Sequence, residues 1–272
     1  MAHQPLVDSH CHIQLLESGL ESPQPYLHQA AERGIAHLLT VSVDLDHVPD
    51  VLALTEQYPQ LSTSVGVHPC GPDLREVAPA ELAAMADHPR VVAIGETGLD
   101  GMCTGPEDQE WHQMRFRNQV RAARIAGKPL IIHSRGAPDD TARILEEEGA
   151  DAVGGVIHCF TDDLPAARRY MALGFHISLS GILTFNQADA LREVAKALPR
   201  EVLLVETDCP YLAPVPHRGH QNRPAWVLEV AECLAEVRGE STAEVARYTT
   251  ENFYRLFPDA PPPLEGVGLA TD

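Results

Sequence analysis

Basic side chains are scarce in this sequence. It has 20 Lys and Arg against 39 Asp and Glu, so its formal net charge at pH 7 is −19. Extended binding of nucleic acid usually needs a basic surface, and the shortage of basic residues argues against one here. The acidic balance also indicates a protein that binds no membrane and attracts anions poorly.

A signal peptide, a membrane-spanning apolar run and solenoid-type repeats are also missing. The chain has 272 residues, of which 44% are hydrophobic, and this is enough to bury one large core. We therefore expect a cytoplasmic protein with a single domain over residues 1–257. The Pro-rich segment 258–272 should be an exposed, disordered tail whose removal is tolerated.

What the sequence does contain is a regular alternation of two patterns. Apolar, β-branched runs predict eight strands at residues 6–12, 35–43, 61–68, 91–96, 129–133, 153–158, 174–180 and 202–208. Helical periodicity lies between them at residues 25–33, 48–57, 81–86, 108–126, 139–148, 164–173 and 187–197. Such alternation over about 200 residues predicts an α/β fold, a (β/α)8 TIM barrel. A doubly wound open sheet is the alternative, although no Gly-x-Gly-x-x-Gly follows the first strand.

Four histidines and two carboxylates stand at the predicted strand ends. The six residues are His10, His12, Glu96, His133, His158 and Asp208. Alternation along a strand places His10 and His12 on one face, and all six should meet at the carboxyl rim of the barrel, where such barrels build their sites. Any one of them alone could be a solvated carboxylate or a hydrogen-bonded core histidine. Six together predict a metal site, because a metal satisfies polar groups that ordinary packing would leave unpaired.

Several short motifs occur in the order typical of one family. They are residues 8–12 (DSHCH), 66–69 (GVHP), 95–100 (GETGLD), 132–135 (IHSR), 158–160 (HCF), 180–185 (SGILTF) and 206–214 (ETDCPYLAP). From residue 6 to about 257 the chain resembles the TatD family of metal-dependent deoxyribonucleases, within the amidohydrolase-like barrels. The resemblance implies a hydrolase of phosphodiesters, typically a 3′ to 5′ exonuclease on single-stranded DNA and in some members RNA. Some relatives are linked instead to removing D-amino acids from tRNA.

The resemblance also implies a role for each ligand. His10, His12, Glu96 and Asp208 would hold one divalent ion, and Glu96, His133 and His158 the other, with Glu96 bridging. Two ions can activate a water and neutralise charge on a phosphate. Their identity stays open: imidazole ligands favour Zn²⁺ or Mn²⁺, whereas the family is usually described as Mg²⁺-dependent.

Other residues are candidates for catalysis or substrate binding. Asp208 is the expected general base, and His68 should contact phosphate or protonate the leaving oxygen, unless it only stabilises a Pro-flanked turn. Arg135 and Arg218 are candidate phosphate clamps, with surface salt bridges as the alternative. Glu206 shares a strand face with Asp208 and could orient a ligand histidine or serve structure alone.

The chain departs from the family pattern at two places. Gly101-Met102 replace the usual tyrosines, and His220 and Arg223 replace a Lys and a Glu, so a base-stacking platform is expected to be missing on that side.

Six cysteines occur, without a Cys-x-x-Cys pair. Those next to proposed ligands, Cys11, Cys159 and Cys209, should face away as small buried hydrophobes and be neither metal ligands nor disulfides, as in a reducing cytoplasm.

The expected partner is therefore nucleic acid as a substrate, contacted briefly at a strand end, with no membrane and with a monomer compatible with the sequence. Two other functions stay open. One is a barrel hydrolase of acyl or amide bonds, including the aminoacyl ester of tRNA, and the other is a non-catalytic metal-binding partner protein.

Overall fold

A ring of eight parallel strands forms the centre of the molecule in the computed structural model, which describes residues 3–70, 78–103, 105 and 109–270. The strands are β2 (Leu6–Cys11), β3 (Ile35–Thr40), β4 (Leu61–Val65), β5 (Val91–Asp100), β6 (Leu130–Arg135), β7 (Gly155–Ile157), β8 (Phe175–Leu179) and β9 (Leu203–Val205). Each pairs with its neighbour in chain order. After β9 the chain returns to β2, where Asp208 N donates to His10 O at 2.9 Å and His12 N donates to Cys209 O at 2.8 Å. The predicted barrel is confirmed, and the open-sheet alternative is wrong.

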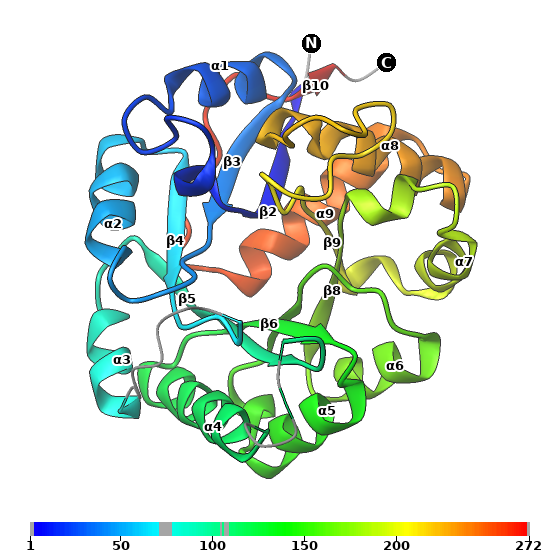
Figure 1. Ribbon diagram of the computed structural model, residues 1–272. Helices are drawn as coiled ribbons and strands as arrows, with labels where there is room; N and C mark the ends of the chain where they lie inside the picture. Colours follow the sequence, from blue (N-terminus) through cyan, green and yellow to red (C-terminus); the bar gives the residue numbers. More distant parts are fainter. Residues whose placement is uncertain (1–2, 71–77, 104, 106–108, 271–272) are drawn as a thin grey trace.

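Helices surround this ring, except that the last one, α9, crosses its centre in the view of Figure 1. They are α1 (Gln24–Glu32), α2 (Val48–Gln57), α3 (Pro79–Met85), α4 (Gln109–Ala126), α5 (Pro138–Glu147), α6 (Leu164–Ala172), α7 (Asp189–Ala197), α8 (Val227–Arg238) and α9 (Thr242–Leu256). The strands are buried on both faces, and β3 (IAHLLT) is accordingly mostly apolar, whereas β4 (LSTSV) buries two serines and a threonine. In the described part of the chain, no helix is long and apolar enough to cross a membrane.

The last two helices, α8 and α9, lie beyond the seven helical segments expected from the sequence. Helix α9 begins with a capping box, in which Ser241 and Glu244 each bond the other's backbone. Its Phe253 is fully buried against Val7 and Leu204 and, with Phe257 just beyond the helix, belongs to the core cluster inside the ring. The Ser-x-x-Glu spacing is typical of a helix start, and the sequence analysis missed it.

The Pro-rich segment predicted as a disordered tail is instead folded back in part. Strand β10 (Leu269–Ala270) pairs antiparallel with β1 (His3–Gln4), and Leu264 N donates to Ala36 O at 3.2 Å. A Cβ at Gly268 would lie 2.7 Å from the carbonyl carbon of Gln4, so the two backbones touch closely. The prediction failed because the backbone of β1 offers hydrogen bonds that sequence composition does not reveal.

Candidate metal centre

Three ligand side chains, His10, His12 and Asp208, converge from the ends of β2 and β9, and Glu96 on β5 is the fourth. Nε2 of His10 and Nε2 of His12 are 3.2 Å apart. Glu96 Oε2 lies 3.4 Å and 3.6 Å from these two nitrogens, and Asp208 Oδ1 lies 3.9 Å and 3.4 Å from them. Ligands about 2.1 Å from a tetrahedral metal ion are roughly 3.4 Å apart, so this group has the spacing of one metal site.

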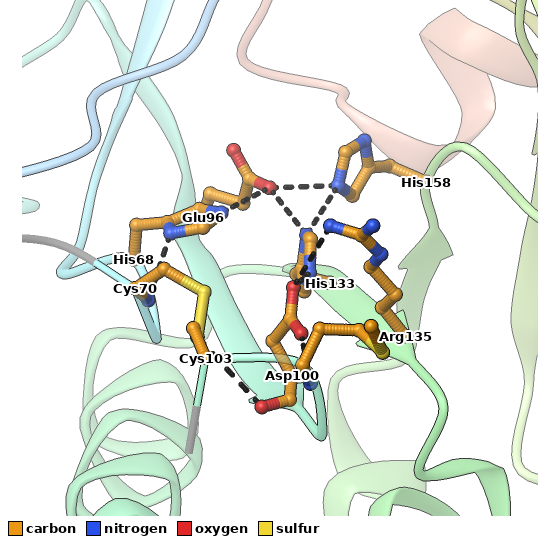
Figure 2. Close-up of a disulfide and its surroundings, with 9 residues drawn as sticks. His68, Cys70, Glu96, Asp100, Cys103, His133, Arg135 and His158 are labelled. Atoms are coloured by element: carbon orange, nitrogen blue, oxygen red, sulfur yellow. Dashed lines mark hydrogen bonds and ion pairs between the residues drawn. A yellow bond between two sulfur atoms is a disulfide. The ribbon is translucent and has the colours of Figure 1, made fainter.

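The other oxygen of Glu96 faces a second group. Glu96 Oε1 is 3.0 Å from His133 Nδ1 and 2.7 Å from His158 Nε2, and the two nitrogens are 3.4 Å apart. Figure 2 shows these side chains directed toward one another from β6 and from the end of β7. The structure therefore brings all six predicted ligands together, with Glu96 placing one oxygen in each group.

In three of the four histidines, His12, His158 and His133, a hydrogen bond on the far side of the ring fixes the nitrogen that faces the centre, whereas Nδ1 of His10 has no such partner. Nδ1 of His12 lies 2.8 Å from Val41 O, which leaves Nε2 for the centre. Glu206 Oε1 lies 3.3 Å from His158 Nδ1 and also accepts from Cys159 N at 2.8 Å. Glu206 thus occupies the orienting position expected from its strand face.

Asp100 plays the same part for His133 and was missed by the sequence analysis. Its Oδ2 lies 2.9 Å from His133 Nε2, so His133 presents Nδ1 to Glu96. Asp100 ends strand β5, which continues four residues beyond the predicted end at Glu96. A Cβ at Gly98 would lie 1.9 Å from His133 O, so only glycine permits this close pairing with β6.

The carboxylates of the centre are held in their charged form. Burial opposes charge on Glu96, yet nearby His158 and His68 lower its pKa well below the ordinary value. Burial likewise opposes charge on Asp208, but bonding to His12 and the charge of His10 lower its pKa. Burial lowers the pKa of His158, but Glu96 and Glu206 outweigh it and raise that pKa well above its usual range. Cations should therefore displace protons from the histidines when they bind, and the donor set fits divalent metal ions.

His68 stands beside this centre in a defined orientation. Its Nδ1 accepts a hydrogen bond from Cys70 N at 3.0 Å, and its Nε2 lies 3.3 Å from Glu96 Oε1. A neutral ring that accepts at Nδ1 carries its hydrogen on Nε2. His68 therefore points a donor, not a ligand lone pair, toward the centre.

A cavity of about 630 Å³ opens over these residues and is lined by groups of different chemistry. Arg135 lines it with a side chain that is 63% exposed and has Nη1 3.8 Å from Asp100 Oδ2. Exposed Tyr211 lines it as well, so an aromatic ring is available although Gly101-Met102 supply none. Arg218 is held elsewhere: its guanidinium lies over the Phe185 ring, 3.8 Å from the centroid, and donates to Ala213 O.

The cysteines divide into two kinds. Cys11, Cys159, Cys209 and Cys233 are free, in agreement with the prediction that the three beside ligands form no disulfide. Cys159 nevertheless corrects the expectation that it faces away, since it lines the cavity and has Sγ 3.1 Å from Ser180 Oγ. The reason is local backbone geometry, because a φ of +45° breaks the strand alternation at Cys159. Burial raises its thiol pKa well above the usual value, which argues against a thiolate nucleophile. Cys70 and Cys103 form a disulfide.

Known proteins resemble the chain over almost its whole length. Residues 7–258 match the family described as TatD related DNase. The chain is 44% identical over 255 residues to the uncharacterized metal-dependent hydrolase YcfH of Escherichia coli K12, covering 93% of this chain and 95% of that protein. It is 38% identical to the uncharacterized metal-dependent hydrolase YabD of Bacillus subtilis, covering 93% and 98%. The crystal structure of the TatD homologue YjjV from Escherichia coli superposes with a TM-score of 0.85 at 31% identity, covering 93% and 98%.

The geometry of the six ligands and these similarities lead to one assignment. The chain belongs to the TatD-related DNase family and is a metal-dependent hydrolase.

Proposed function

We propose that this protein removes nucleotides from the 3′ end of single-stranded DNA by hydrolysing phosphodiester bonds. The observation that carries the proposal is a cavity in which Glu96 joins two ligand groups while Arg135 stands on the wall. Two divalent ions held by these groups would lower the pKa of a water and neutralise charge on the phosphate.

The protein's own side chains supply positioning and proton transfer. Asp208, which lines the cavity with 14% of its side chain exposed, accepts the proton of the attacking water. His68 donates from Nε2 to the leaving oxygen, since the amide of Cys70 occupies its other nitrogen. Arg135 binds oxygens of the phosphate, and the Tyr211 ring stacks on the terminal base.

The size and charge of the molecule favour a strand end over a long duplex. A cavity of about 630 Å³ is in the range of small-ligand sites and admits only a short segment. The net charge of −19 disfavours contact with many phosphates outside it. The cavity is therefore suited to a strand end, and the proposed substrate is single-stranded DNA, with RNA as a second substrate to be compared in the same assay.

The test is a comparison of labelled substrates with metal-loaded protein. A 5′-labelled oligonucleotide should give a ladder shortened from its 3′ end, and a 3′-labelled one should release labelled mononucleotide at once. D-aminoacyl-tRNA and neutral amides should be turned over far more slowly. Rapid cleavage of an acyl or amide bond without DNA cleavage would instead assign the protein to the small-substrate or deacylase class. Turnover of no substrate by a protein that binds metal would favour a non-catalytic partner.

The two arginines provide a matched pair for the phosphate contact. Arg135→Ala should raise KM for a short oligonucleotide about ten-fold or more, because a charge-assisted hydrogen bond is lost. Arg218→Ala should leave KM unchanged, because Arg218 is held over Phe185. Metal content should be the same in both. Equal KM values for the two variants would remove Arg135 from the substrate site.

A further inference from the structure

The disulfide Cys70–Cys103 lies at the edge of the catalytic cavity. It joins the segment after β4 to the turn after β5, and its two Cα atoms are 5.8 Å apart across 33 positions of sequence. Cys70 lines the cavity, and both residues are exposed. Figure 2 shows the sulfur pair beside His68 and Asp100. A disulfide in such a position is accessible to reductants from solvent.

One half of this disulfide is coupled directly to a catalytic side chain. The backbone N of Cys70 donates to His68 Nδ1 at 3.0 Å. This bond sets the ring so that Nε2 faces Glu96 Oε1 at 3.3 Å. The path of the backbone at Cys70 therefore determines which nitrogen of His68 donates into the cavity.

The other half is attached to a rigid part of the barrel. Cys103 lies in the turn that begins at Asp100, and Asp100 Oδ1 accepts from Met102 N at 2.7 Å. Asp100 is 2% exposed and bonds His133 through its second oxygen at 2.9 Å. The disulfide therefore ties the segment that carries His68 to a turn that is anchored at the end of β5.

We propose that the Cys70–Cys103 disulfide is a positioning element that holds His68 in its donor orientation, and that a reductant lowers turnover by breaking it. This proposal rests on the proposed function of the site. A phosphine reductant would take up one oxygen from water and become a phosphine oxide, while the two sulfurs gain two electrons and two protons and become thiols. Cys70 would then lose its covalent link to the β5 turn, and His68 would sample other ring orientations.

Activity should be measured on a short oligonucleotide with oxidised protein, with phosphine-reduced protein and with the double variant Cys70→Ser/Cys103→Ser. Reduction should lower kcat about ten-fold with little change in KM, because positioning of an acid–base group is impaired while substrate contacts remain. The double variant should match the reduced protein and should not respond to the reductant. Cys233→Ser, which alters a free thiol, should respond as the wild type does. Reoxidation of the wild type should restore kcat.

A readout that needs no turnover separates this proposal from the proposed function. Nitrogen-15 spectra of histidine-labelled, zinc-loaded protein should show one protonated and one unprotonated ring nitrogen for His68, assigned with His68→Asn. Reduction should shift both signals toward averaged values. If DNA is cleaved but neither the His68 signals nor kcat respond to reduction, the positioning role of the disulfide is refuted and the proposed function stands. If the His68 signals respond to reduction but no phosphodiester is cleaved, the proposed function is refuted and the positioning role of the disulfide stands.

Two results concerning the sulfurs themselves would also overturn the proposal. One is mass spectrometry showing six free thiols after mild oxidation of the folded protein. The other is a zinc ion bound by Cys70, Asp100 and Cys103 in the protein as purified, because these three can also form a ligand group when the sulfurs are not bonded to each other. An equal response to the reductant in the double variant would trace the effect to loss of metal.

Discussion

Glu96 is the residue on which both halves of the metal centre depend. Its Oε2 lies within 3.6 Å of the Nε2 atoms of His10 and His12, and its Oε1 lies within 3.3 Å of one ring nitrogen each of His68, His133 and His158. The residue is 2% exposed. A carboxylate can bridge two ions because both of its oxygens share one negative charge. A neutral side chain of the same size cannot replace it.

Glu96→Gln tests this bridge. The variant should bind one divalent ion or fewer per chain in place of two, and kcat should fall by about 10²-fold or more because the metal pair is lost. Metal content by elemental analysis and far-ultraviolet circular dichroism would show whether the ions are lost while the barrel stays folded. The exposed Glu193→Gln on α7 is the control. Two bound ions and normal turnover in Glu96→Gln would refute the bridge.

In the proposed function, Asp208 has two roles, metal binding and proton transfer. Asp208→Asn keeps an oxygen near His12 Nε2 but loses the charge, so kcat should fall about 10²-fold or more while substrate affinity changes less. Single-turnover kinetics and binding to a short oligonucleotide would separate the two effects. An unchanged kcat with weaker binding would make Asp208 a binding residue only.

His37, which lies away from the metal centre, should make the free energy of unfolding depend on pH. Burial and then Arg90 lower its pKa to about 3 in the folded chain, where it lies 2.8 Å from Ser62 Oγ. In the unfolded chain the pKa of His37 returns to its ordinary value of 6.5, so the stability that the neutral ring contributes is complete above pH 6.5. It is lost progressively as the pH falls from 6.5 toward about 3.

Between about pH 7 and pH 5, the wild type should therefore lose about 2 kcal/mol more of unfolding free energy than His37→Gln. Urea unfolding of metal-free protein measures this without a contribution from ion release. His28→Gln, at a side chain that is 74% exposed, should behave as the wild type does. The same pH dependence in His37→Gln would show that His37 is not the group responsible.

At the scale of elements, the candidate metal ligands lie at one end of the barrel and the pairing of the two chain ends lies at the other. The six ligands lie on or just after the carboxyl ends of β2, β5, β6, β7 and β9. At the amino ends, β1 pairs with β10. Leu269 also packs against the main core, so the C-terminal segment contributes to stability without touching the site.

Removal of residues 258–272 should therefore destabilise the protein by about 1–3 kcal/mol and leave kcat unchanged. Denaturant unfolding and the oligonucleotide assay would check both parts. Gly268→Val in the full chain is a matched variant, because its Cβ would lie 2.7 Å from the carbonyl carbon of Gln4 and prevent docking. Wild-type stability in both variants would show that the β1–β10 contact adds nothing.

At the scale of the whole molecule, acidic side chains outnumber basic ones by 39 to 20. The net charge is −19, and bound divalent ions with Arg135 would attract phosphate only at the cavity. The slope of log affinity against log salt for a short single-stranded oligonucleotide should be shallow, equivalent to about two or three phosphates. Affinities of the slow variant Asp208→Asn, measured at several salt concentrations before turnover, would give this slope. A slope several times steeper would reveal a wider binding surface.

Residue patterns in the sequence were sufficient to predict the barrel and the meeting of six ligands. Strand and helix periodicities are local, and parallel strands that close into a barrel bring their carboxyl ends to one rim. Once the fold was predicted, residues such as His10 and His158 had to approach each other, and their rings stack with centroids 4.0 Å apart.

Contacts that depend on loop paths and on register were decided only by the tertiary structure. Asp100 reaches His133 because β5 continues past Glu96 beside β6, and Arg218 turns to Phe185 because of the course of its loop. The Cys70–Cys103 disulfide and the β1–β10 pair join segments far apart in sequence. Local side-chain patterns cannot predict these contacts. A disulfide or a strand pair forms only where the folded backbone brings its two partners within bonding distance.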